Sequence, residues 1–138
     1  ATLNHIMVGD KIWLGRLRSQ GRPFDVLPVS VADLPDFRGL DMPLFDDFHA
    51  LCVHREAMDA AIEDMAAALT PEAVSRPMHY TNTQGRAREH PTWQALSHLF
   101  NHQTHHRGQV TTLLMQAGID PGVTDLIALV NPPETPRP

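Results

Sequence analysis

"HLFNHQTHHRGQV", residues 98–110, places four histidines within nine positions and follows them with Arg-Gly-Gln. Around it, apolar residues recur at helical spacing over about residues 91–117. On one helix, side chains four residues apart lie on the same face and can reach one ion. His98 and His102 have that spacing, and so do His102 and His106. The stretch therefore predicts either a metal site along a helix or a histidine-rich surface.

Helical geometry separates the four histidines. At about 100° per residue, measured from Trp93, the apolar side chains of this segment cover roughly 200–340°. His106 falls near 220° and His102 near 180°, inside and at the edge of that arc, by the same arithmetic. His98 and His105 fall near 140° and 120°, toward solvent or a neighbouring partner. The pair that faces the core is therefore His102 and His106.

Polar groups accompany this pair. Gln103 and Arg107 fall on the apolar face, where each needs a buried partner or a wet cavity. Asp10 lies on the main apolar face of an earlier helix, so we expect a salt bridge to Arg107, or a role as an acceptor that orients a ligand histidine. Gly108 is costly in mid-helix and either admits a close neighbour or is simply tolerated.

The rest of the chain reads as one all-α domain over residues 1–138. The segment "TLNHIMVGDKIWLGRLR", residues 2–18, predicts the first helix. Residues 19–44 contain four prolines and no sustained periodicity, so they predict a long crossover with at most a short turn near 31–37. The remaining predicted elements are a helix over about 44–69, a small hairpin or ordered loop over 78–91, and a short helical piece at 124–130 that folds back.

Composition narrows the class of protein. The formal charge of -5 is spread without a basic stripe, which argues against a nucleic-acid partner. Cys52 is the only cysteine, so an internal disulfide and cysteine-cluster zinc sites are excluded, and a buried, inert thiol is expected. Without a membrane-length apolar run or a leader pattern, we expect a soluble, cytoplasmic protein.

Other histidines and the methionines are assigned structural roles. Four histidines have no partner at ligand spacing on their own elements and are expected at the surface or at caps: His49, His54, His79 and His90. Four methionines are expected to fill the core: Met7, Met58, Met65 and Met115.

Three motifs resemble those of the DinB family of helical-bundle proteins. "TLNHIMVGDKIWL" resembles its first conserved helix, "NHQTHHRGQV" its hallmark near the last bundle helix, and "YTNTQG" its hairpin. The resemblance implies a four-helix bundle with one long crossover loop, in which His5, His102 and His106 bind a divalent ion between helices. Spacing selects the last two independently. His5 rests on the resemblance alone, because periodicity places it opposite the main apolar face.

The resemblance also implies a helix before the His5 segment, which this sequence lacks. We expect either that a preceding piece is missing or that a partner chain covers the exposed apolar face, and we favour a homodimer.

Three neutral imidazoles with an open position are typical of a catalytic site and suit Zn or Ni. Such an ion lowers the pKa of a bound water or thiol. Because family relatives use low-molecular-weight thiols, the resemblance implies a metal-dependent S-transferase or related isomerase acting on a small molecule, with Asp10, Gln103 and Arg107 shaping the site. The alternatives are a metal-dependent hydrolase of a small substrate and a non-catalytic, metal-binding stress-response protein.

Overall fold

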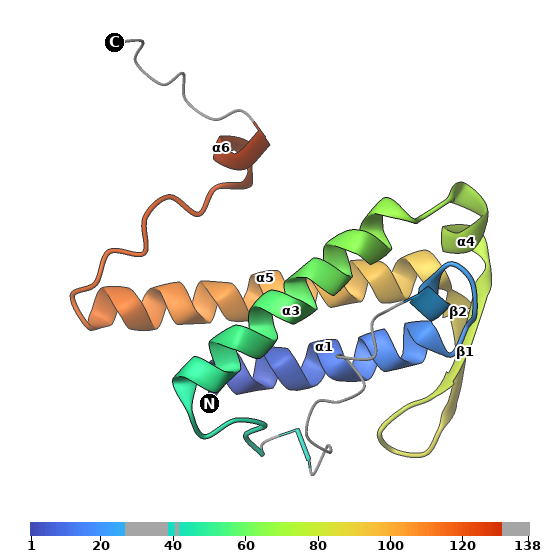
Figure 1. Ribbon diagram of the computed structural model, residues 1–138, viewed down its shortest axis with the longest axis horizontal. Coiled ribbons are helices and arrows are strands. Elements are labelled where there is room, and N and C mark those ends of the chain that lie inside the picture. Colours follow the sequence, from blue (N-terminus) through green and yellow to red (C-terminus); the bar gives the residue numbers. More distant parts are fainter. Residues whose placement is uncertain (27–38, 41, 131–138) are drawn as a thin grey trace.

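Helices make up most of the structure, a computed structural model that describes residues 1–26, 39–40 and 42–130 (Figure 1). The described chain has three long helices: α1 (Thr2–Arg18), α3 (Phe48–Ala67) and α5 (Thr92–Gln116). Its shorter elements are η1 (Phe24–Val26), α4 (Pro71–Ser75), β1 (Pro77–Thr81), β2 (Ala87–Pro91) and α6 (Leu126–Val130). The prediction of a helical protein with one small hairpin is confirmed.

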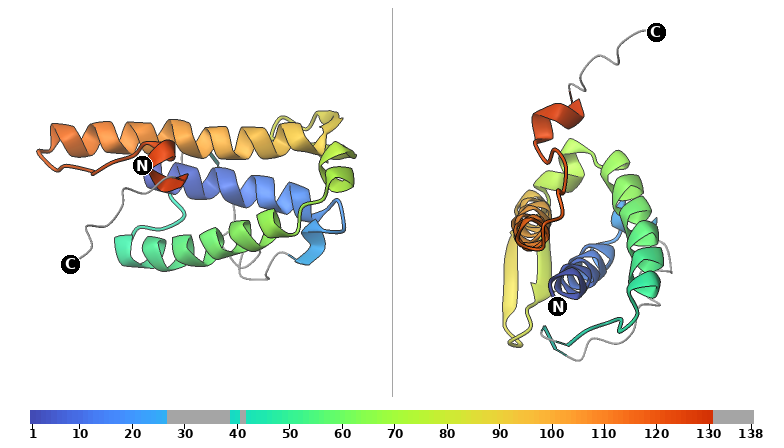
Figure 2. Two further views of the ribbon diagram at one scale, coloured as in Figure 1. Left: turned by 90° about the horizontal axis from the view of Figure 1, so that it is seen from above. Right: turned by 90° about the vertical axis from the view of Figure 1, so that its left-hand side faces the viewer.

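The long helices lie at the corners of a triangle in the end-on view of Figure 2. In Figure 1, α1 and α3 run in the same direction and α5 runs against them. Two parallel helices that follow each other in sequence need a connection that returns along their length, as the punctuated segment after α1 predicts. The turn expected near residues 31–37 lies outside the described residues.

The core forms where α1 meets α3 and α5. Met7, Leu14 and Leu17 project from one face of α1 at helical spacing and are fully buried. Met58 and Met65 from α3, and other apolar side chains of α3 and α5, pack with them. Each such side chain contributes about 1.5–3 kcal/mol on burial, so this face holds the three helices together.

A side-chain cap begins α3, and two hydrogen bonds of Thr92 anchor the start of α5. Asp47 accepts a hydrogen bond from the Ala50 amide, so α3 begins at Phe48 and the expectation of a start near Leu44 is wrong by about one turn. Thr92 donates from its hydroxyl and from its amide to the Arg76 carbonyl oxygen, at 2.8 and 2.9 Å. These bonds tie the start of α5 to the hairpin.

The hairpin pairs β1 and β2 antiparallel, from Pro77 opposite Pro91 to Thr81 opposite Ala87. Gly85 closes it with φ of +75°, a conformation that glycine adopts without a side-chain clash. At the other end of α5, Gly118 has φ of +76° and ends the helix as the sequence predicts.

Asn4 fixes the end of the crossover segment against α1. Its side-chain oxygen accepts from the amides of Leu44 and Phe45, at 2.8 and 2.9 Å. Its side-chain nitrogen donates to the Phe45 carbonyl oxygen at 2.9 Å. The chain just before α3 is therefore held against α1 next to His5, the residue that follows Asn4.

The last turns of α5 and residues 117–130 are mostly exposed. Met115 is 60% exposed, so its assignment to the core is wrong, and Leu113 on the predicted apolar arc is 55% exposed. The short helix α6 leaves Leu126 and Ile127 at 74% and 64% exposed, and so buries little apolar surface. The fourth bundle helix stays a prediction. Among the described helices, none carries an apolar stretch long enough to cross a membrane.

Candidate metal centre

Three histidines from two antiparallel helices meet at one point. His5 lies in the first turns of α1, and His102 and His106 lie one turn apart in the middle of α5. One ring nitrogen from each falls within 4.8 Å of the other two, and all three side chains are half-buried. Antiparallel packing of α1 on α5 therefore brings together residues that lie about a hundred positions apart in sequence.

The hydrogen bonds of His5 and His106 define which nitrogens face the cluster. His5 Nδ1 lies 3.2 Å from the Leu40 carbonyl oxygen, and His106 Nδ1 lies 2.8 Å from Gln109 Oε1. Both partners are oxygen acceptors, so each Nδ1 carries the proton and each Nε2 keeps its lone pair. An imidazole held in this way is the usual arrangement of a metal-ligating histidine.

His102 completes the group with a ring that is short of partners. Its Nε2 lies 3.3 Å from His5 Nε2, and its buried Nδ1 has no hydrogen-bond partner among the described residues. Burial, reinforced by repulsion from His106 and His5, lowers the pKa of His102 to about 4. The imidazole is thus neutral near pH 7, which is the state that a metal ion requires.

The distance between His5 and His102 fits a shared cation. With His5 Nδ1 protonated, its Nε2 lone pair points at His102, and the pair is stable only with a proton or a cation between the two nitrogens. Two nitrogens bound to one tetrahedral zinc at about 2.0–2.1 Å stand about 3.3–3.4 Å apart. The observed 3.3 Å matches that separation. The three residues fit a divalent metal ion.

Gly9 allows the His102 ring to approach α1. A Cβ atom built on Gly9 would stand 2.6 Å from His102 Cε1 and 3.1 Å from its Nδ1, closer than real side chains pack. Gly9 follows His5 by four residues, so both lie on the face of α1 that the His102 ring crosses. The four-residue spacing of His5 and Gly9 was the only feature of the sequence that could have indicated the contact between Gly9 and His102.

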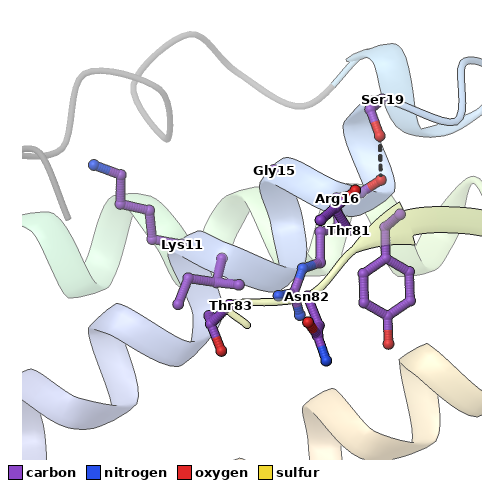
Figure 3. Close-up of a pocket in the computed structure, with 9 residues that line it drawn as sticks. Lys11, Gly15, Arg16, Ser19, Thr81, Asn82 and Thr83 are labelled. Atoms are coloured by element: carbon purple, nitrogen blue, oxygen red, sulfur yellow. Dashed lines mark hydrogen bonds between the residues drawn. The ribbon is translucent and has the colours of Figure 1, made fainter. Parts of the chain in front are cut away.

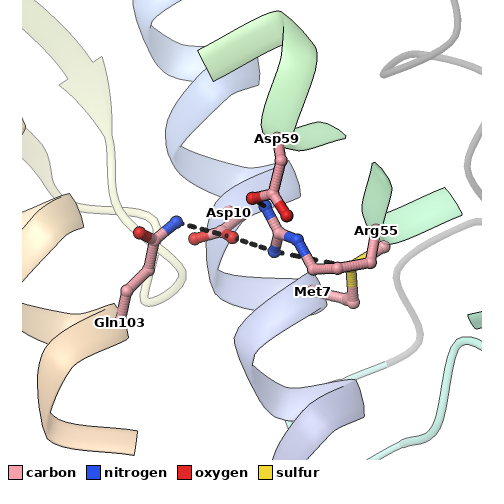
Figure 4. A network of polar contacts seen from close by, with 5 residues as sticks. All are labelled: Met7, Asp10, Arg55, Asp59 and Gln103. Carbon is pink, nitrogen blue, oxygen red and sulfur yellow. Dashed lines mark hydrogen bonds and ion pairs between the residues drawn. The ribbon is translucent and has the colours of Figure 1, made fainter. Parts of the chain in front are cut away.

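A polar network centred on the buried Asp10 connects α1, α3 and α5 (Figure 4). Asp10 is fully buried and its Oδ2 accepts from Gln103 Nε2 at 2.9 Å and from Arg55 Nη1 at 2.5 Å. Arg55 also donates to Asp59 Oδ1 at 2.6 Å. The network therefore links α5, α1 and α3 one residue away from His102.

Burial raises the pKa of Asp10, and the hydrogen bond and charge of Arg55 act against that rise. Burial also lowers the pKa of Arg55, but its bonds to Asp10 and Asp59 outweigh that effect and raise it. Each group offsets part of the cost of burying the other, so removing one alone leaves its partner without that compensation.

The structure corrects the expected partner of Asp10. Asp10 pairs with Arg55, whereas Arg107 is exposed and donates only to Thr104 Oγ1, at 3.4 Å. The expected salt bridge between Asp10 and Arg107 is therefore wrong, whereas the role of Asp10 in orienting a ligand histidine stays a prediction. The expectation that Arg107 helps to shape the site stays a prediction. A Cβ at Gly108 meets nothing within 4 Å, so no neighbour requires a glycine there.

The other predictions for side chains near the site mostly hold. Gln103 is buried with a partner, as its place on the apolar face requires. His98 and His105 are exposed, and the His98 ring packs 4.9 Å from the Trp13 ring. Cys52 is half-buried rather than buried. Sequence reasoning missed Arg55, whose position on α3 gave no signal.

The comparisons with known proteins give one result at the level of family. The sequence model of the DinB family matches residues 1–135. No curated protein and no solved structure matches the chain.

Proposed function

Since this chain belongs to the DinB family and its structure brings His5, His102 and His106 together, we propose that it is a metal-dependent enzyme that acts on a small molecule. The observation that carries the proposal is that one ring nitrogen of each of the three histidines lies within 4.8 Å of the other two. Zinc or nickel is the metal that such nitrogen ligands favour.

The number of ligands supports catalysis over a structural role. Structural zinc sites use four protein ligands, whereas catalytic sites use three and leave one position for water or substrate. Among the described residues, no fourth histidine, cysteine or carboxylate belongs to the group. The three side chains are half-buried, so a small molecule can reach the centre from solvent.

A bound divalent ion would supply Lewis acidity, which lowers the pKa of a water or thiol and stabilises developing negative charge. The chain's own residues hold the site in place for this chemistry. Gly9 lets the His102 ring lie against α1, and the network of Gln103, Asp10 and Arg55 fixes α5 against the other two helices.

Transfer of a low-molecular-weight thiol, or a related isomerisation, is the reaction that we propose, because it is the activity that the resemblance to the DinB family implies. The open position would serve water equally well, which keeps hydrolysis of a small substrate as the second candidate. Turnover that depends on an added thiol supports the first reaction, and turnover without thiol supports the second.

Metal content tests the centre itself. After stringent dialysis, elemental analysis should find one metal ion per chain in the wild type and none in a folded His106→Ala variant. His105→Ala is the matched control, because His105 is the adjacent, exposed histidine outside the group. Retention of metal by His106→Ala would overturn the assignment. A cobalt-substituted protein whose spectrum shows four protein ligands and no exchangeable water would favour a non-catalytic, metal-binding protein instead.

A further inference from the structure

A shallow cleft of about 530 Å³ lies between α1 and the hairpin, apart from the three histidines (Figure 3). The last turns of α1 form one wall, with Gly15, Arg16 and Ser19. The end of β1 and the turn that follows form the other, with Tyr80 and residues 81–83. Arg16, Ser19 and the hydroxyl and amide groups of residues 80–83 place polar groups in a lining whose exposed surface is mostly apolar, so the cleft suits a small molecule that has both an apolar part and a polar group.

Arg16 is the cationic group at the centre of this cleft. Its guanidinium carbon lies 4.7 Å from the centre of the Trp13 ring and 4.6 Å from that of Tyr80. No carboxylate of the described residues forms an ion pair with it. Burial lowers the pKa of Arg16, and Tyr80 opposes that effect. A guanidinium that is partly desolvated, held by two rings and without a counter-ion is a ready partner for an anion.

Further donors surround the guanidinium. Asn82 Oδ1 accepts from the amides of Gln84 and Arg86, at 3.0 and 2.9 Å, which leaves the side-chain nitrogen as a donor. Thr81 and Thr83 line the same wall and add hydroxyl groups. Lys11 also borders the cleft, but its side chain extends away from Arg16 in Figure 3. A planar fork with nearby amide and hydroxyl donors matches the oxygens of a carboxylate or phosphate.

The cleft and the metal centre lie on one side of α1. By helical arithmetic His5 and Arg16 are only about 20° apart around the axis and about 16 Å apart along it. Aromatic rings fill the interval: the His98 ring packs 5.9 Å from that of His102 and 4.9 Å from that of Trp13. One elongated small molecule could therefore contact both ends of this surface.

We propose that the cleft around Arg16 binds the oxyanion group, a carboxylate or a phosphate, of a small-molecule ligand. That this ligand is the substrate of the three-histidine centre rests on the proposed function. The metal centre would then act on one end of the molecule while Arg16 holds the other.

Fluorescence of Trp13 reports on the cleft directly, because its ring touches the guanidinium. The protein has two tryptophans, and Trp93 is 51% exposed, so Trp93→Phe leaves Trp13 as the only source of signal. Succinate and inorganic phosphate are titrated separately at constant ionic strength, which removes general screening. Saturable quenching or enhancement by succinate identifies a carboxylate site, and by phosphate a phosphate site. No saturable change with either probe overturns the proposal.

Two variants test the role of Arg16 in that titration. Arg16→Gln should weaken binding tenfold or more, because a charge-assisted bond is lost. Arg86→Gln removes a charge from the exposed hairpin turn outside the cleft and should change the dissociation constant by less than twofold. Equal losses in both variants, or none in Arg16→Gln, would refute the site.

A third variant keeps the test decisive if Arg16→Gln fails to fold. A Cβ atom at Gly15 meets nothing within 4 Å and Gly15 is exposed in the lining of the cleft, so Gly15→Leu should place its side chain in the cleft. It should abolish saturable binding, and an unchanged dissociation constant would contradict the proposal. The titrations are repeated on His106→Ala, where anion binding should persist. Loss of the metal site and loss of the anion site are therefore measured independently.

Discussion

Gly9→Ala is the smallest change that should disturb the metal centre without removing a ligand. The added methyl group would stand 2.6 Å from His102 Cε1. To reach ordinary van der Waals contact at 3.4 Å, the His102 ring or the helix must move by about 0.8 Å. The ring is the element that yields, because α1 is held on its other faces by buried core side chains.

That displacement is large on the scale of metal coordination. Bond lengths at a metal site vary by about 0.2 Å, so a shift several times larger breaks the alignment of His102 Nε2 with His5 Nε2. Misplaced ligand histidines typically lower metal affinity by about 10–100-fold, which corresponds to roughly 1.4–2.8 kcal/mol. For folding, the gain of about 1 kcal/mol from replacing a helical glycine is offset by overpacking of about 1–3 kcal/mol.

Gly15→Ala provides the matched control on the same helix, since a Cβ there meets nothing within 4 Å. It should stabilise the protein by about 0.5–1 kcal/mol and leave metal affinity unchanged. Zinc affinity is measured by competition with a chromophoric chelator, and stability by urea denaturation followed by circular dichroism. If Gly9→Ala binds zinc as tightly as Gly15→Ala and gains the same stability, the contact between Gly9 and His102 does not exist as described.

Three further predictions follow from the polar contacts and the exposed surface. Asp10→Ala should cost about 3–5 kcal/mol in urea denaturation because the partly buried Arg55 keeps only the exposed carboxylate of Asp59 and Gln103 loses its acceptor. Arg107→Ala should change stability by less than about 0.5 kcal/mol. Similar losses in both variants would support a pair between Asp10 and Arg107. Asn4→Ala removes three hydrogen bonds to Leu44 and Phe45 and should lower the free energy of unfolding by about 2–3 kcal/mol. It should also lower zinc affinity measurably, because the segment beside His5 is then held less firmly. Unchanged zinc affinity would show that these hydrogen bonds stabilise the fold without positioning His5. Homodimerisation stays a prediction, and light scattering should give a mass near twice 15.4 kDa, with a value near 15.4 kDa counting against it.

The long helices could be predicted from sequence because each carries a local signal. The apolar spacing of α1 and α5 fixes both their existence and their buried faces, and the same arithmetic placed Gln103 and the His102–His106 pair toward the interior. The signal weakens where burial depends on other elements. Met115 and Leu113 continue the apolar pattern of α5, but the described residues leave them exposed, since spacing records which face is apolar and not what covers it.

Contacts between helices were harder to predict than the helices themselves. A buried Asp10 needs a cationic partner, and Arg107 was the predicted partner because it lies on α5, the helix that carries His102 and His106. The structure supplies Arg55 from α3 instead, because the rotation and offset of α3 against α1 place that guanidinium over the carboxylate. Neither quantity can be read from the periodicity of a single helix, so the pairing of buried charges across helices was left undetermined.

His5 shows the same limit from the opposite direction. A single apolar stripe describes a helix with one buried face, yet α1 presents a second face that carries His5, Gly9 and Arg16 at helical spacing. That face contacts α5 and the hairpin through rings and polar groups as well as through Ile12, so the main apolar stripe does not reveal it. The spacing still has a physical meaning, because the proposed metal ligand His5, the glycine in close contact with a ring, Gly9, and the cation Arg16 lie along one line of the helix surface. A substitution on this line should therefore alter binding more than stability, whereas one on the apolar stripe should do the reverse.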